Sequence, residues 1–178
     1  NNFVQKSIYE ENSRHLLSTY EQVDKTFTMF VQHNWNALSD WSNNLQYLDD
    51  AENMKTLWYE FARRKDAWQY QDFYMFNENC DFITAAGRDG NAPNIQGIFL
   101  DMYETGQPVI SSYIASDSNR RIVFALPMEV PYTINGITYS GLAVSYNNDV
   151  VEKLIAGNIY QGQSDCYILT SDGNVLLS

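Results

Sequence analysis

The first third of the chain carries large side chains at the spacing of one long helix. They recur every three or four positions, at Leu16, Tyr20, Val23, Phe27, Phe30, Asn34, Ala37, Trp41 and Leu45. This spacing holds one stripe on a single face of a helix. Because no proline or glycine precedes Gly87, the pattern predicts an uninterrupted helix over residues 3–47.

A second helix is predicted over residues 51–68, where Asp49 and Asp50 can cap the N-terminus. Its inward positions are Met54, Leu57, Trp58 and Phe61. Two interpretations are open for the stripe on the first helix. It is buried entirely against the second helix, or it packs on the rest of its domain, on a partner protomer, or on both. In a homodimer, Asn34 would be a polar residue that sets the register.

Beyond residue 71 the pattern changes to short β-type runs. Two runs flank an Asn-Glu-Asn turn, and Asn135-Gly136 between β-branched residues is a strong hairpin signal. Strands are predicted within 72–87 (a pair), 109–115, 121–130, 132–146 (a hairpin) and 164–178 (a pair). Short helices are predicted within 95–108 and 149–157, and turns at 87–94 and 116–120.

This order of elements contains no βαβ alternation, so it favours an α+β fold. We expect the long N-terminal helix and the second helix to pack on an antiparallel sheet of five or six strands. The chain then divides into a helical stalk over residues 1–70 and a sheet-containing module over residues 71–178.

Composition and motifs disfavour several classes of function. The 22 acidic residues exceed the 11 basic ones, for a formal charge of −11, which argues against a nucleic-acid partner. His15 and His33 lie five helical turns apart, about 27 Å at 1.5 Å per residue, and cannot share a metal. The sequence has no metal-ligand, phosphate-loop or nucleophile-elbow motif. We therefore expect no enzyme, no cofactor and no metal, and we expect Cys80 and Cys166 to stay apart.

Several local features resemble one family of sensor domains. They are the strand order, the run from Phe124 to Pro127, Gly141 in the hairpin and the terminal Asp172-Gly173. Over nearly its whole length, the chain resembles the membrane-distal PAS-like module of bacterial double-CACHE (dCACHE) extracytoplasmic sensor domains. Such modules occur in chemoreceptors, histidine kinases and membrane-bound GGDEF proteins. The resemblance implies a membrane-anchored parent, a location outside the cytoplasm, and a second, membrane-proximal module after Ser178.

The resemblance also implies a ligand pocket between the concave face of the sheet and the short helix. In the amino-acid-sensing subset that helix carries Arg-x-Trp-Tyr, which falls here on Leu100-Asp101-Met102-Tyr103, where only Tyr103 agrees. The acid that usually holds the ligand amine falls near Tyr146. Both departures argue against a standard amino acid as the ligand. Candidate lining residues are Tyr74, Tyr103, Tyr113, Arg121, Phe124 and Tyr146.

Ordinary core packing is the alternative for each of these side chains, and the favoured one for Phe124. Two functions therefore remain. The first is a ligand-sensing ectodomain that binds a small molecule and signals through the long helix. The second is a non-catalytic structural or interaction module whose core fills its own cavity. Converging polar groups in an accessible pocket would indicate the first function, since fold similarity alone does not establish either.

Overall fold

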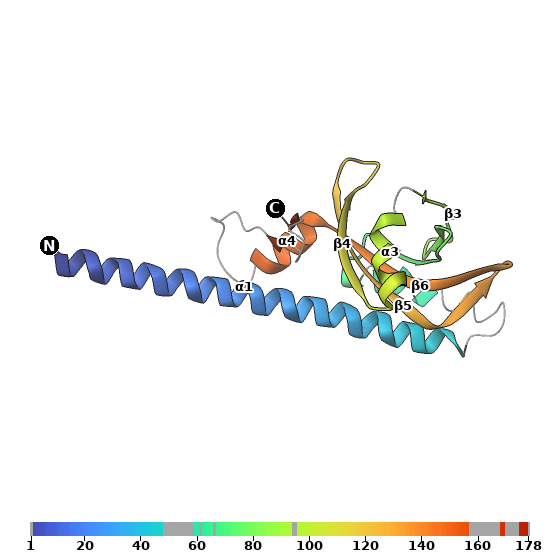
Figure 1. The fold of residues 1–178 in the computed structure, drawn as a ribbon, viewed down its shortest axis with the longest axis horizontal. Coiled ribbons are helices and arrows are strands. Elements are labelled where there is room, and N and C mark those ends of the chain that lie inside the picture. The colour runs from blue at the N-terminus through green and yellow to red at the C-terminus, as the bar shows by residue number, and fades with distance from the viewer. Residues whose placement is uncertain are drawn as a thin grey trace.

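The computed structural model describes residues 2–47, 59–60, 62–65, 67–93, 96–156, 168–169 and 175–177. Helix α1 (Asn2–Leu45) is continuous and runs along one side of the molecule, with its N-terminal part extending beyond the sheet (Figure 1). The predicted long helix is confirmed, with ends within two residues of those expected. Among the described helices, none has the length and hydropathy that a membrane-spanning segment requires.

Six strands form one antiparallel sheet in the order β3-β2-β1-β6-β5-β4. Their bounds are β1 (Asp72–Phe76), β2 (Asp81–Thr84), β3 (Asp89–Asn91), β4 (Val109–Ile114), β5 (Arg120–Ile134) and β6 (Ile137–Asn147). The helices that follow in the chain are α3 (Gln96–Thr105) and α4 (Asn148–Ala156). The predicted α+β fold with its antiparallel sheet is confirmed.

The C-terminal strands do not join this sheet. The described parts of β7 (Ile168–Leu169) and β8 (Val175–Leu177) pair with each other in a separate two-stranded sheet. The predicted terminal strand pair therefore exists.

The Asn135-Gly136 hairpin prediction is confirmed, and one turn prediction is wrong. Asn135 and Gly136 have φ values of 50° and 81°, the two positive values that the tightest hairpin turn requires. Residues 89–91 were expected in a turn but form β3, which pairs with β2. The side chain of Asn91 stabilises this edge of the sheet, because its Nδ2 donates to the backbone oxygen of Asn79. Tertiary pairing here overrides the weak β-propensity of Asp, Gly and Asn.

The sheet is buried on both faces, and each face has its own apolar cluster. Alternation along β1 sends Phe73 and Met75 to one cluster and Tyr74 and Phe76 to the other, as the period of a strand predicts. Helix α1 covers the first face, and α3 covers the second. We call these the α1 face and the α3 face.

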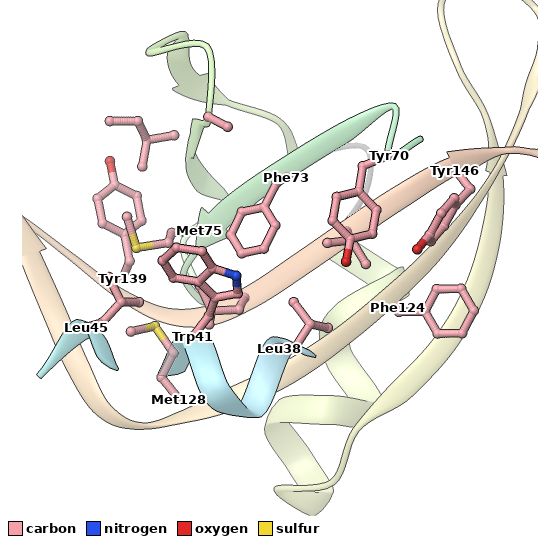
Figure 2. Close-up of a cluster of buried hydrophobic side chains, with 14 of the residues drawn as sticks. Leu38, Trp41, Leu45, Tyr70, Phe73, Met75, Phe124, Met128, Tyr139 and Tyr146 are labelled. Atoms are coloured by element: carbon pink, nitrogen blue, oxygen red, sulfur yellow. The ribbon is translucent and has the colours of Figure 1, made fainter. Parts of the chain in front are cut away.

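The stripe on α1 packs against the sheet. Leu38, Trp41 and Leu45 are buried in the α1-face cluster, and the stripe as far back as Val23 packs against it. Figure 2 shows Leu38 and Trp41 rising from the helix toward the strands. Burial of the stripe entirely against a second helix is therefore wrong for the described residues, because β5 and β6 supply the main apolar surface.

The predicted second helix is described only in part. Residues 59–60, 62–65 and 67–68 are helical, whereas Met54, Leu57, Trp58 and Phe61 lie outside the described residues. Its described part contacts α1 at two places. The guanidinium of Arg64 lies 4.4 Å from the ring centroid of Trp41, and the ring of Trp68 stacks on that of His33 with centroids 3.8 Å apart.

Candidate ligand-binding site

The centre of the α3 face is filled by the chain's own side chains. Phe99 and Met102 of α3 are buried against the sheet, and the rings of Phe76 and Phe99 stack with centroids 4.0 Å apart. Gly141 opposite Phe76 leaves room for that ring, since a Cβ there would lie 2.5 Å from Phe76 Cζ. The Phe76 ring therefore requires a residue without a side chain at position 141.

One pocket lies beside α3, where the helix meets the β1–β2 turn. It has a volume of about 320 Å³ and is lined by Asn77, Glu78, Cys80, Gln96, Phe99, Leu100, Tyr103 and Glu104. The hydroxyl of Tyr103 accepts a hydrogen bond from Ser140 Oγ at 3.3 Å, and burial raises the pKa of Tyr103 to about 12. We call this the Tyr103 pocket. None of its lining side chains is Lys, Arg or His, so it offers no cation to a ligand.

A second group of polar side chains lies at the opposite end of the α3 face. Arg121 of β5 stands directly across from Tyr113 of β4 and from Asn147 of β6. Ser145 lies two residues before Asn147 on the same strand and therefore faces the same way. We call these four residues, Tyr113, Arg121, Ser145 and Asn147, the polar corner.

Arg121 is the charged centre of the polar corner. It is only 6% exposed, and its Nη2 donates to Asp117 Oδ2 at 2.6 Å across the β4–β5 turn. The side chain of Asp117 is 48% exposed, and the hydrogen bond from Arg121 is the main cause that lowers the pKa of Asp117 to about 2. Burial raises the pKa of Tyr113, and the charge of Asp72 adds to this effect.

Three buried atoms in the polar corner have no hydrogen-bond partner: Arg121 Nη1, Ser145 Oγ and Asn147 Oδ1. Asn147 uses its Nδ2 to donate to Gln71 Oε1 at 3.0 Å, which leaves the oxygen free. Native proteins pair the great majority of such groups, so each unpaired one calls for an explanation. A water molecule or a ligand could supply the missing partners.

On the α1 face, the side chains of Tyr146 and Asn34 are hydrogen-bonded within the chain. Tyr146 donates its hydroxyl to Asn34 Oδ1 at 2.7 Å, and Asn34 donates to the backbone oxygen of Phe30 at 2.9 Å. Asn34 is fully buried, so its amide serves this contact within the chain. It is therefore not available to set the register of a dimer.

Phe124 lies in the same α1-face cluster as Tyr146. Its ring packs edge-on against those of Phe30, Trp35 and Tyr146. Figure 2 shows Phe124 and Tyr146 on neighbouring strands, with Tyr70 beside them.

The six candidate residues therefore lie in four places. Phe124 and Tyr146 belong to the α1 face, and Tyr103 belongs to the Tyr103 pocket. Tyr113 and Arg121 stand in the polar corner. Tyr74 lies in the α3-face cluster beside Phe76 and Phe99, and burial is the main cause that raises its pKa.

Sequence reasoning did not single out Ser145, Asn147 or Asp117. A usable signal existed at the end of β6, where Ser145 and Asn147 alternate with Val144 and Tyr146 after an apolar run. Within the described ranges, no three His, Cys, Asp or Glu side chains come together as metal ligands. Cys80 has a free, half-buried thiol, and Cys166 lies outside the described residues.

Several solved sensory domains have a similar fold. The Campylobacter jejuni chemoreceptor Tlp3 sensory domain, solved with isoleucine bound, aligns with a TM-score of 0.69 over 99% of this chain and 74% of that one, at 12% identity. The ligand-binding domain of Pseudomonas fluorescens chemoreceptor CtaA, in complex with L-serine, aligns with a TM-score of 0.66 over 96% and 73%, at 11% identity. The chain shares the fold of these sensory domains.

A histidine kinase provides a third such domain. The sensor domain of V. cholerae DctB aligns with a TM-score of 0.53 over 84% of this chain and 60% of that one, at 12% identity. No protein-family model and no curated protein matches the sequence. The three neighbours are sensory domains of chemoreceptors and a histidine kinase, which agrees with the expectation that this chain is not an enzyme. The dCACHE-like fold predicted from the sequence is thereby confirmed.

Proposed function

We propose that this chain is the ligand-sensing part of a membrane-anchored bacterial signal transducer and works on the extracytoplasmic side of the membrane. Residues 71–178 act as the sensor module, and residues 1–70 form the helical stalk that carries the signal. The sensory domains that share the fold support this role. The single observation that carries it is the set of three buried, unpartnered polar atoms in the polar corner. Buried polar groups without partners are rare in native proteins, and a bound ligand is one way to satisfy them.

The two faces of β6 provide a route from ligand to stalk. Ser145 points toward the α3 face, and the next residue, Tyr146, points toward α1 and donates its hydroxyl to Asn34. A ligand that shifts β6 at Ser145 therefore acts on a buried hydrogen bond to the long helix. A homodimer through α1 is part of the same proposal, as two stalks side by side would carry the displacement together.

The ligands bound by similar sensory domains guide the choice of compounds to test. Isoleucine is bound in Tlp3 and L-serine in CtaA, so small amino acids belong in any ligand panel. This chain has no cation on α3, and we therefore propose that its ligand is not held through that helix. Tyr74, Tyr113 and Arg121 are the proposed lining on the sheet, and Tyr103 is the proposed lining of the separate Tyr103 pocket.

The test is a thermal-shift screen of the 178-residue chain against amino acids, organic acids, amines, purines and sugars. A ligand at 100 times its dissociation constant adds about 2.7 kcal/mol of stability, which is a shift of several degrees for a chain of this size. Tyr103→Ala and Arg121→Gln then separate the two places, since only one variant should lose the response.

A second candidate function is a structural or interaction module with a self-filled core. The stacked Phe76 and Phe99 and the buried Met102 between α3 and the sheet favour it. Absence of any stabilising compound across the panel, together with a high melting temperature, is the result that this second function predicts.

A further inference from the structure

The burial of the Arg121 guanidinium is only partly compensated by its acidic partner, Asp117. Among the described residues Arg121 is the one charged side chain that is buried. A buried charge is costly unless it is paired and its hydrogen-bonding groups are satisfied. Its one acidic contact, Asp117, is about half exposed and uses only Nη2. The buried Nη1 is left without a partner.

The neighbours of Arg121 define what the missing partner must offer. A guanidinium holds a carboxylate best through parallel hydrogen bonds, and Nη1 is a free donor for one. Asn147 Oδ1 is a free acceptor, so it requires an N–H or O–H donor. Ser145 Oγ is unpartnered and can take either role. The set is complementary to a group that accepts from Arg121 and donates to Asn147.

The other site on the α3 face does not suit such a ligand. The Tyr103 pocket is lined by Glu78 and Glu104 and by no Lys, Arg or His, so a carboxylate there would meet like charge without compensation. Helix α3 carries no cation over its ten residues either. Among the residues that the structure describes, the one buried positive charge on this face is therefore that of Arg121 on β5.

We propose that the polar corner binds a small carboxylate that also carries an N–H or O–H donor, with Arg121 as its anchor. The inference rests on the proposed sensory function and names the class of its ligand. Tyr113, half-buried on the neighbouring strand, forms the apolar wall. Asp117 competes for the same guanidinium from the exposed β4–β5 turn, so its carboxylate lies close to where the ligand's own would lie.

The experiment is isothermal titration of the 178-residue chain with matched sets of compounds. Hydroxy- and amino-carboxylates of three to six carbons are each compared with their carboxamides and with analogues that lack the hydroxyl or amine. Inorganic phosphate and sulfate are included as simple anions. We expect at least one carboxylate with a donor to bind, its carboxamide to bind at least ten-fold more weakly, and the analogue without the donor to be weakened as well.

Four variants locate the site. Arg121→Gln should abolish binding and Arg121→Lys should weaken it, because lysine keeps the charge but loses the planar fork. Asp117→Asn should tighten binding several-fold, since it removes the competing charge and leaves the buried residues in place. Arg120→Gln is the matched control: it removes the same charge one residue away, on the opposite face of the strand, where Arg120 contacts Ser112. Circular dichroism melts establish that each variant is folded.

The outcomes are distinguishable. Binding of a carboxylate that survives Arg121→Gln, or that Asp117→Asn weakens, overturns the assignment to the polar corner. Binding of phosphate and sulfate as tight as that of every carboxylate overturns the ligand class. Binding only of amines or uncharged compounds also overturns the class but leaves the sensory function standing. Absence of any ligand across the broad panel overturns the sensory function itself.

Discussion

Two adjacent residues of β6, Tyr146 and Ser145, face opposite sides of the sheet and differ in how their buried hydroxyls are satisfied. On the α1 face, Tyr146 and Asn34 hydrogen-bond to each other inside an aromatic cluster. On the α3 face, one residue away along β6, Ser145 is just as buried but has no partner. A completed buried hydrogen bond contributes to stability, whereas an unpartnered buried group calls for a water molecule or a ligand. At this position, one side of β6 is tied to α1 and the other side is open to a partner.

The largest effect should come from emptying the α1 face. Phe124→Ala removes a fully buried ring that contacts Phe30, Trp35 and Tyr146. We expect a loss of about 3–5 kcal/mol in the free energy of unfolding, as for other buried Phe→Ala changes. Chemical denaturation provides the measurement, with Tyr113→Ala on the half-buried α3 side as the matched comparison. Equal losses for the two variants would contradict the assignment of stability to the α1 face.

A smaller loss should follow from Tyr146→Phe. The change removes the hydroxyl that Asn34 Oδ1 accepts from at 2.7 Å, and it leaves a buried oxygen unpaired. The expected cost is about 1–3 kcal/mol. The double variant with Asn34→Leu should cost less than the sum of the single changes, because both halves of the pair are then absent. Strict additivity in a double-mutant cycle would show that the hydrogen bond contributes nothing.

Ser145→Ala should behave in the opposite way from Tyr146→Phe, although the two residues are adjacent. The hydroxyl of Ser145 is buried without a partner, so its removal relieves a desolvation penalty instead of breaking a bond. We expect stability to stay the same or to rise by up to about 1–3 kcal/mol, the usual cost of such an unpaired group. The same variant should weaken binding of the carboxylate. A clear loss of stability in urea would show that Ser145 has a structural partner.

The fold could be predicted from the sequence where the signal is local. The stripe on α1, the Asn135-Gly136 turn and the alternation along β1 each depend on a few neighbouring residues, and each is confirmed. The partner of the stripe could not be predicted, because both faces of the central strands are apolar. Residues 141–146 of β6 are all buried, so their pattern does not indicate which face α1 covers.

The candidate site shows the same limit. Arg121 could be singled out from the sequence as a cation at the start of an apolar strand run, but its neighbour Arg120 is the same residue type. Residue type alone could not show that Phe124 and Tyr146 lie on the α1 face and Tyr113 on the α3 face. The face that binds a ligand depends on where the helices pack. The pairing of Arg121 with Asp117 depends on closure of the β4–β5 turn, where Ser118 has a φ of 65°. Only the folded chain brings these two residues together.

The smallest effect concerns the titration of Asp117 at the edge of the polar corner. The hydrogen bond from Arg121 lowers the pKa of Asp117 to about 2, from an ordinary value of 3.8. Because the folded-state pKa is the lower one, the stabilisation is present above about pH 4 and is lost as the pH falls toward 2. Carboxyl carbon shifts followed by NMR should show this low pKa.

Two variants sharpen the measurement. In Arg121→Gln the pKa of Asp117 should return toward 3.8, because the main cause of its depression is removed, whereas Arg120→Gln should leave it low. A bound carboxylate should raise the same pKa, since it competes for the guanidinium that holds Asp117 ionised. A pKa of Asp117 that stays unchanged on ligand binding would mean that the ligand does not reach Arg121. The same titration thus reports both the internal ion pair and its displacement by ligand.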